Sequence, residues 1–299
     1  MRYAVSFIGL LIGIMSANAK PVIDFVDCNI TDFPLTYERP DFILNTGPRQ
    51  SDICVVTDQR LTEVDRLRAE GYTTIIAYLL DSVEIYRSIY DWAARNRHKF
   101  DLILTHERTL LDAYPDKCKF IHAIGWGPLK NEGIHPKSKM VSIMTGKNWT
   151  FGHRLRLEVL NRYRPYFDGI KTYDEPFAPY KDPWLVDFRY AMIIENDRRD
   201  YWFTEKLIDA FRSGTVPIFW GCPSIGQFFD VRGMIIWEDI NELETILPTL
   251  SEADYLSRMP YIISNFQKAA LYPTHKGAWD INLPESLDCL WPYLQQYIH

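Results

Sequence analysis

The sequence predicts an α/β fold with two domains, each built on a parallel β-sheet that is covered by helices. Two observations carry this prediction. Short apolar runs alternate with segments of helical periodicity along most of the chain, and this is the pattern of parallel strands joined by helices. A stretch rich in Pro and Gly, 125–136, interrupts the alternation and divides it into two cycles.

The length of the chain agrees with this division. The 299 residues, 47% of them hydrophobic, are enough to form two modest cores. We expect an N-terminal Rossmann-like domain over 20–136 and a second domain over 137–272. A helical tail, 273–299, is expected to pack back against them.

The first domain is predicted from apolar runs that are short enough to be strands. Four such runs occur, at 22–26, 53–56, 74–79 and 102–104. Helical periodicity marks two of the intervening segments, 61–69 and 83–97.

The second domain is expected to begin with a strand at 140–144 and a helix at 153–163. A longer unit follows, in which strand 191–194 leads through a polar loop to a helix and then to strand 216–220. In parallel sheets, ligands bind beyond the carboxyl ends of the strands. The loop 145–152 and the residues after 194 are therefore expected at one binding edge.

The helix of the longer unit has recognisable ends. Thr204 is a plausible N-cap and Gly214 a suitable C′ residue. Glu205 and Lys206 then occupy the first turn. A lysine there opposes the helix dipole by a few tenths to about 1 kcal/mol, so its presence suggests an anionic ligand.

The segment 195–221 resembles the donor-binding signature of the family 10 glycosyltransferases, the α1,3/4-fucosyltransferases. The match comprises the Glu-Asn pair that opens the segment and the run TEKLIDAFRSGTVPIFWG that ends it. A match of this length is far more specific than a short glycine motif. The resemblance is strongest over 137–272 and weaker over 75–111. One position departs from the pattern, because Trp202 stands where the family usually has tyrosine.

The resemblance implies a GT-B-like fold, in which two Rossmann-like domains face each other across a cleft, with the acceptor on the N-terminal side. It implies an inverting glycosyltransferase, most directly an α1,3-fucosyltransferase that moves fucose from GDP-fucose to a glycan or glycoconjugate acceptor, with no cofactor required. Two alternatives stay open. One is a transferase that uses another nucleotide sugar, and the other is a catalytically silent module that binds a nucleotide or carbohydrate.

The resemblance also implies which residues bind the donor. An arginine that meets the donor pyrophosphate is assigned to Arg154, with Arg156 as a close alternative because the local alignment can shift by two residues. Lys147 is a third candidate cation, and Glu205 is expected to accept hydrogen bonds from donor hydroxyls, those of ribose first. The other donor-binding candidates are Glu195, Asn196, Trp202, Thr204 and Lys206.

Inversion requires a base that takes the proton of the acceptor hydroxyl. The family carries a glutamate just after a strand of the N-terminal domain, and the corresponding place after strand 74–79 holds Asp81, with Glu84 nearby. Glu107 follows strand 102–104 and is a further candidate.

A metal-independent mechanism is expected. Fixed cations stabilise the negative charge that develops on a departing nucleoside diphosphate, and the sequence has no D-x-D triplet of the kind that binds metal and nucleotide sugar. Five widely spaced cysteines without a C-x-x-C motif indicate neither a zinc site nor a dense disulfide framework. The net charge of −6 argues against a nucleic-acid partner.

The segment 1–19 has the three parts of a secretory signal peptide: Arg2, an apolar run, and Ala17-Asn18-Ala19. We expect a cleaved signal or a short anchor, hence a secretory or Golgi location with possible membrane association. The alternatives are a buried first strand of a cytosolic enzyme and an incorrectly chosen start codon.

Overall fold

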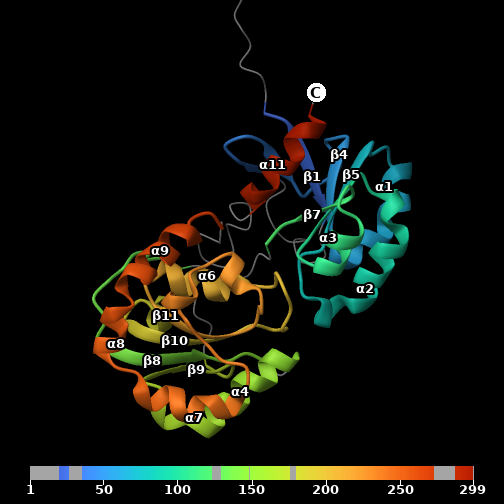
Figure 1. The fold of residues 1–299 in the computed structure, drawn as a ribbon. Coiled ribbons are helices and arrows are strands. Elements are labelled where there is room, and N and C mark those ends of the chain that lie inside the picture. The colour runs from blue at the N-terminus through green and yellow to red at the C-terminus, as the bar shows by residue number, and fades with distance from the viewer. Residues whose placement is uncertain are drawn as a thin grey trace, which may run out of the picture.

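The computed structural model describes residues 20–26, 36–122, 129–147, 149–175, 180–272 and 287–298. The predicted signal-like segment 1–19 lies outside these residues, as do residues 125–128 of the predicted linker. No helix in the described ranges has the length and apolar character needed to cross a membrane. Figure 1 shows two α/β bodies, one built from the first part of the chain and one from the middle part.

Seven strands form the first sheet, in the order β2-β3-β1-β4-β5-β6-β7. Neighbouring strands are parallel except for the antiparallel pair β2–β3. In chain order the strands are β1 Val22–Val26, β2 Thr36–Glu38, β3 Ile43–Asn45, β4 Ile53–Thr57, β5 Thr74–Tyr78, β6 Leu102–Thr105 and β7 Cys118–Phe120.

Helices cover one face of this sheet. Apolar side chains from alternate positions of β4 and β5 form a core with the helices that connect the strands. These helices are η1 Asp58–Glu63, α1 Val64–Ala69, α2 Val83–Asn96, η2 Arg97–Lys99 and α3 Arg108–Ala113.

The second sheet has five parallel strands in the order β12-β11-β10-β8-β9. Its central strand, β10, is buried at every position, as expected for a parallel strand with both faces covered. The strands are β8 Lys139–Met144, β9 Gly169–Lys171, β10 Phe188–Ile194, β11 Val216–Trp220 and β12 Ile235–Ile236.

Helices lie on both faces of the second sheet, in two separate apolar cores. The major ones are α4 Phe151–Tyr163, α6 Glu205–Arg212 and α9 Met259–Ala269. Shorter helices are η3 Arg164–Tyr166, α5 Asp182–Leu185, η4 Ile225–Gln227, η5 Val231–Gly233, η6 Ile240–Glu242, α7 Leu243–Ile246, η7 Leu247–Thr249 and α8 Glu252–Ser257.

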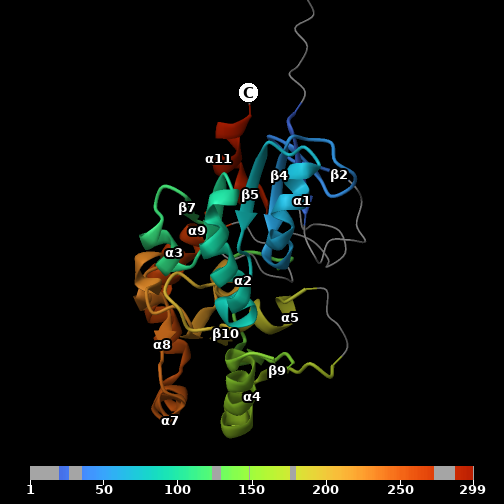
Figure 2. The same ribbon diagram turned by 90° about the vertical axis from the view of Figure 1, so that its right-hand side faces the viewer.

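The C-terminal helices return to the first domain, as Figures 1 and 2 show. They are η8 Leu287–Leu290, α11 Trp291–Leu294 and η9 Gln295–Tyr297. The Trp291 ring stacks on Phe42 at a centroid distance of 5.6 Å, and Leu290 and Leu294 are buried among side chains of β1, β4 and β5. The C-terminal segment therefore covers the face of the first sheet opposite to α1 and α2.

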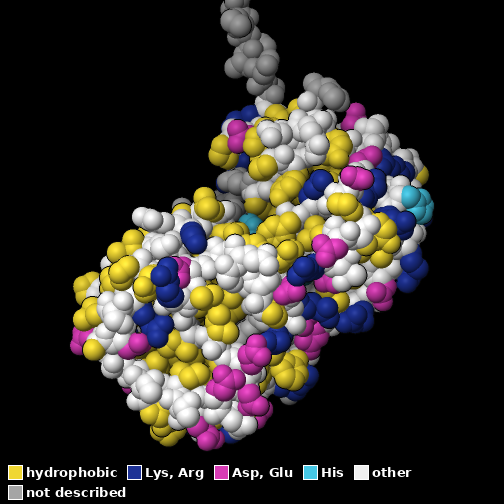
Figure 3. All heavy atoms as spheres, viewed as in Figure 1, with side chains coloured by type: hydrophobic (Ala, Val, Ile, Leu, Met, Phe, Trp, Pro, Cys, Tyr) yellow, Lys and Arg dark blue, Asp and Glu magenta, His cyan; other side chains and the backbone are white. Residues whose placement is uncertain are grey.

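The surface seen in Figure 3 carries Lys and Arg side chains interspersed with Asp and Glu. Four cysteines fall within the described residues and form no disulfide: Cys54, Cys118, Cys222 and Cys289.

Candidate functional site

The carboxyl edge of the second sheet holds a cavity of about 160 Å³, which we call the edge cavity. Apolar residues at the ends of β8 and β10 form its floor. Its polar lining comes from the loop after β8, from the helices α4 and α6 and from the residue before α5. It consists of Thr145, Arg156, Lys181, Glu205 and Lys206.

The N-terminus of α6 is held by a short polar network. The Thr204 hydroxyl caps the helix by accepting a hydrogen bond from the Lys206 N–H at 3.3 Å. The buried carboxylate of Glu195 accepts hydrogen bonds from the Thr204 N–H at 2.9 Å and from its hydroxyl at 2.8 Å. The predicted N-cap is confirmed, and Glu195 serves to fix the start of α6 against the end of β10.

Arg156, and not Arg154, lines the edge cavity. Arg156 is 6% exposed, and its guanidinium donates to the Ile194 carbonyl and to the Asn196 side-chain oxygen, both at 2.8 Å. Burial lowers its pKa to about 10, so it stays charged at neutral pH. Arg154 is exposed, because two residues along a helix turn the side chain by about 200°.

A glycine makes this arrangement possible. A Cβ on Gly152 would lie 1.8 Å from the Glu195 carbonyl oxygen, so only glycine lets the first turn of α4 pack directly on the end of β10. This close approach brings Arg156 within reach of the backbone of β10.

Lys181 joins two carboxylates of α6. Its ammonium lies 2.7 Å from Asp209 Oδ2 and 3.2 Å from Glu205 Oε1, and both carboxylates are almost fully buried. Burial would raise the pKa of Glu205, but Lys181 and Lys206 lower it to about 2. Burial raises the pKa of Asp209 to about 6 although Lys181 acts against it. Glu205 Oε2 is buried and makes no hydrogen bond within the described residues.

Lys206 also lines the cavity. Its ammonium lies 3.0 Å from the Thr204 hydroxyl and 3.6 Å from a carboxylate oxygen of both Glu195 and Glu205. With Arg156 and Lys181, it gives the cavity three cations.

Asp81 approaches this site from the first domain. Burial raises the pKa of its carboxyl, while Lys206 lowers it and Glu205 raises it, so the carboxyl lies within electrostatic reach of the edge cavity. The Ser82 N–H donates to Asp81 Oδ1 at 2.8 Å, and the Tyr90 hydroxyl donates to the Asp81 carbonyl at 2.6 Å.

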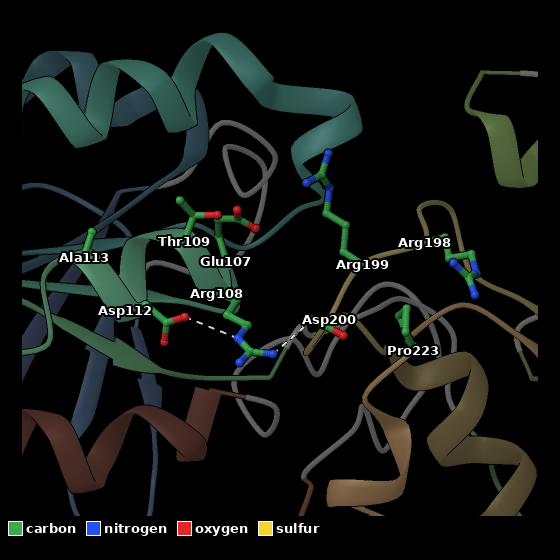
Figure 4. A pocket seen from close by; sticks show the side chains of 9 residues that line it. All are labelled: Glu107, Arg108, Thr109, Asp112, Ala113, Arg198, Arg199, Asp200 and Pro223. Atoms are coloured by element: carbon green, nitrogen blue, oxygen red, sulfur yellow. Dashed lines mark hydrogen bonds and ion pairs between the residues drawn. The ribbon is translucent and has the colours of Figure 1, made fainter.

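The other two predicted carboxylates have different surroundings. Glu84 Oε1 accepts a hydrogen bond from the Phe151 N–H at 2.6 Å, and so links α2 to the first residue of α4 in the second domain. Glu107 lines a larger cavity of about 780 Å³ between the domains. At this interdomain cavity Arg108 joins Asp200 at 3.2 Å, as Figure 4 shows.

Trp202 and Lys147 are not among the residues that line the edge cavity. The Trp202 ring is 2% exposed and packs on His106 of the first domain, with ring centroids 4.4 Å apart. Lys147 is exposed and lies over the rings of Trp149 and Tyr173. Trp202 therefore contributes to the contact between domains.

Sequence reasoning missed Lys181 and Asp209. The sequence could have indicated Asp209, since it stands four residues after Glu205 and so lies on the same face of α6. No sequence pattern could have indicated Lys181, because it reaches the site only through the pairing of strands that are distant in sequence.

Three comparisons place the chain among known proteins. No family model matches it. A segment of 64 residues is 31% identical to the α-(1,3)-fucosyltransferase FucT of Helicobacter pylori, and the match covers 21% of this chain and only 13% of that protein. An α1,3-fucosyltransferase structure with GDP-fucose aligns with a TM-score of 0.53 over 98% of this chain and 94% of the other, at 14% identity.

The fold is GT-B. A trehalose-6-phosphate synthase structure aligns with a TM-score of 0.57 over 93% of this chain and 94% of the other, at 10% identity. Because several glycosyltransferases of different specificity share this arrangement, the GT-B fold confirms the predicted architecture and leaves the donor sugar open.

Proposed function

We propose that this GT-B protein is a glycosyltransferase that transfers fucose from GDP-fucose to a glycan acceptor with inversion. The observation that carries the proposal is the convergence of Arg156, Lys181 and Lys206 on a cavity at the N-terminus of α6. Helix α6 lies within the segment 195–221, which resembles the fucosyltransferase donor signature. The similarity to the Helicobacter pylori fucosyltransferase supports the same assignment.

The donor diphosphate is proposed to bind the three cations and the N–H groups at the start of α6. Breaking the bond between sugar and phosphate leaves negative charge on the diphosphate, and fixed cations stabilise that charge in the transition state. Each charge-assisted hydrogen bond contributes roughly 1.5 to 3 kcal/mol. The free oxygen of Glu205 is proposed to accept a hydrogen bond from a donor hydroxyl.

Asp81 is the proposed base. Its carboxyl lies within electrostatic reach of Lys206 and Glu205, and burial raises its pKa, which suits a group that must accept a proton near neutral pH. Glu84 is committed to the Phe151 N–H, and Glu107 lines the separate interdomain cavity. A mechanism that needs no metal stays part of the proposal, as does the secretory or Golgi location expected from the segment 1–19.

The test is release of GDP from GDP-fucose with and without a panel of glycan acceptors, with the anomeric configuration of the product determined by NMR. We expect acceptor-dependent release with an inverted product. Asp81→Asn should lose turnover and keep GDP binding, whereas Glu107→Gln should keep both.

Binding of GDP without turnover across the panel would favour the silent module instead. A trehalose-6-phosphate synthase studied for glycosyl transfer with retention shares the fold. A product with retained configuration would therefore overturn inversion without overturning the fold.

A further inference from the structure

An exposed aromatic cluster flanks the edge cavity. Trp149 is 73% exposed and Tyr173 is 54% exposed, unusual values for side chains of this size. The Lys147 ammonium lies 5.4 Å from the centroid of the Trp149 ring and 4.6 Å from that of Tyr173. We call these three residues the aromatic clamp.

The topology of the second sheet places the clamp beside the edge cavity. Lys147 and Trp149 follow β8, and Tyr173 follows β9, which is the parallel neighbour of β8. Both loops therefore leave the sheet at its carboxyl edge. Thr145 and Gly146, which directly precede the clamp, line the edge cavity itself.

The clamp also stands close to the first domain. Phe151, two residues after Trp149, is bound through its N–H to Glu84 at 2.6 Å. Glu84 lies three residues after Asp81, the proposed base. The clamp therefore lies near the contact between α2 and α4, and Figure 2 shows α2 above α4.

The chemistry of the clamp fits one kind of ligand. Exposed aromatic faces bind the apolar faces of sugar rings, and an exposed cluster of such rings marks a binding surface. Among the described residues, Lys147 forms no ion pair with an acid, so its charge is available to an anion. Since the Lys147 ammonium lies over both rings, the anion it meets would be carried by the sugar that stacks on them.

We propose that the aromatic clamp is the acceptor subsite, and that it binds a saccharide bearing a carboxylate. This proposal rests on the proposed function and goes beyond it by giving the acceptor class. The rings hold the sugar face, and Lys147 meets the carboxylate.

The test uses Trp149→Ala and Tyr173→Ala, with Tyr166→Ala as the matched control. Tyr166 is another exposed aromatic, 41% exposed, in η3 after the far end of α4. The probes are a uronic-acid-containing trisaccharide and its neutral methyl ester. We expect the two clamp variants to raise the acceptor KM at least tenfold, with the KM for GDP-fucose and its acceptor-independent hydrolysis unchanged, and the control to behave as wild type.

Lys147→Ala provides the second measurement. It should weaken the carboxylated trisaccharide about tenfold and leave the methyl ester unaffected. If no fucose transfer is found, direct binding of both trisaccharides to the protein without donor, followed by NMR saturation transfer, gives the same comparison. The absence of fucose transfer would overturn the proposed function alone.

Three outcomes would overturn the acceptor subsite itself. The first is acceptor binding that is equal in wild type and clamp variants. The second is a loss of GDP affinity in Trp149→Ala, which would mean that the rings stack on the nucleotide base. The third is equal binding of acid and ester in both wild type and Lys147→Ala.

Discussion

Replacing Lys181 with methionine removes the one cation that joins both buried carboxylates of α6. The Lys181 ammonium lies 2.7 Å from Asp209 and 3.2 Å from Glu205, and the two carboxylates are 0% and 7% exposed. Breaking a buried pair by removing one partner leaves an uncompensated charge and destabilises a protein by about 3 to 5 kcal/mol. We expect a loss of this size in the free energy of unfolding at pH 7.5.

The loss should shrink in acid. The pKa of Asp209 is already raised to about 6 by burial, and it rises further when Lys181 is absent. Asp209 then binds a proton in the folded state at pH 5.5, which removes the unpaired charge. A raised folded-state pKa stabilises an acid below that pKa, so the variant recovers stability relative to wild type as the pH falls.

Urea unfolding at pH 7.5 and pH 5.5 measures both effects, and titration with GDP measures the affinity of the proposed donor site. Without Lys181, the pKa of Glu205 rises and its orientation is lost, so GDP affinity should fall about tenfold, the value of one charge-assisted hydrogen bond. Lys181→Arg should restore much of the stability, since it keeps the charge.

Lys139→Met is the surface control for this experiment. Lys139 pairs with Asp187 at 3.6 Å where both side chains are over 40% exposed, and such a pair contributes less than about 1 kcal/mol. If Lys181→Met lost no more stability than this control at pH 7.5, the reasoning about the contacts of Lys181 with Glu205 and Asp209 would be refuted.

Three further predictions follow from other contacts. Burial lowers the pKa of His106 to about 3 from 6.5. The free energy of unfolding therefore falls as the pH drops below 6.5, because the unfolded chain binds a proton that the folded chain does not. Between pH 7 and 5, wild type should lose roughly 2 kcal/mol more than His106→Gln in urea unfolding. Arg156→Ala should weaken GDP binding by about 10- to 100-fold in calorimetry, whereas Arg154→Ala should change it less than twofold, and equal losses would contradict the placement of α4. Gly152→Ala forces a Cβ to within 1.8 Å of a backbone oxygen. It should lower the thermal midpoint by several degrees, since overpacking costs typically about 1 to 3 kcal/mol. The control Gly226→Ala brings its Cβ within 3.4 Å of a side-chain atom only and should be nearly neutral.

Much of the fold is predictable because its signals are local. The buried strands β1, β4, β5, β6, β8 and β11 lie within a residue or two of the apolar runs that predict them. Gly214 has φ of +67°, as a C′ residue requires. The short strands β9 and β12 have 3 and 2 residues. They escape prediction because a run this short cannot display a hydrophobic periodicity.

What the sequence by itself determined is the α/β class, the edge of the second sheet where the candidate donor residues gather, and the lysine in the first turn of α6, since each depends on residues that are neighbours in the chain. The tertiary structure alone decided which arginine reaches that edge, because the rotation of α4 depends on its packing through Gly152. It also decided that Lys181 joins the site and that Trp202 seals the domain contact. Those roles depend on strand order and domain packing, which bring together residues that a linear pattern cannot pair.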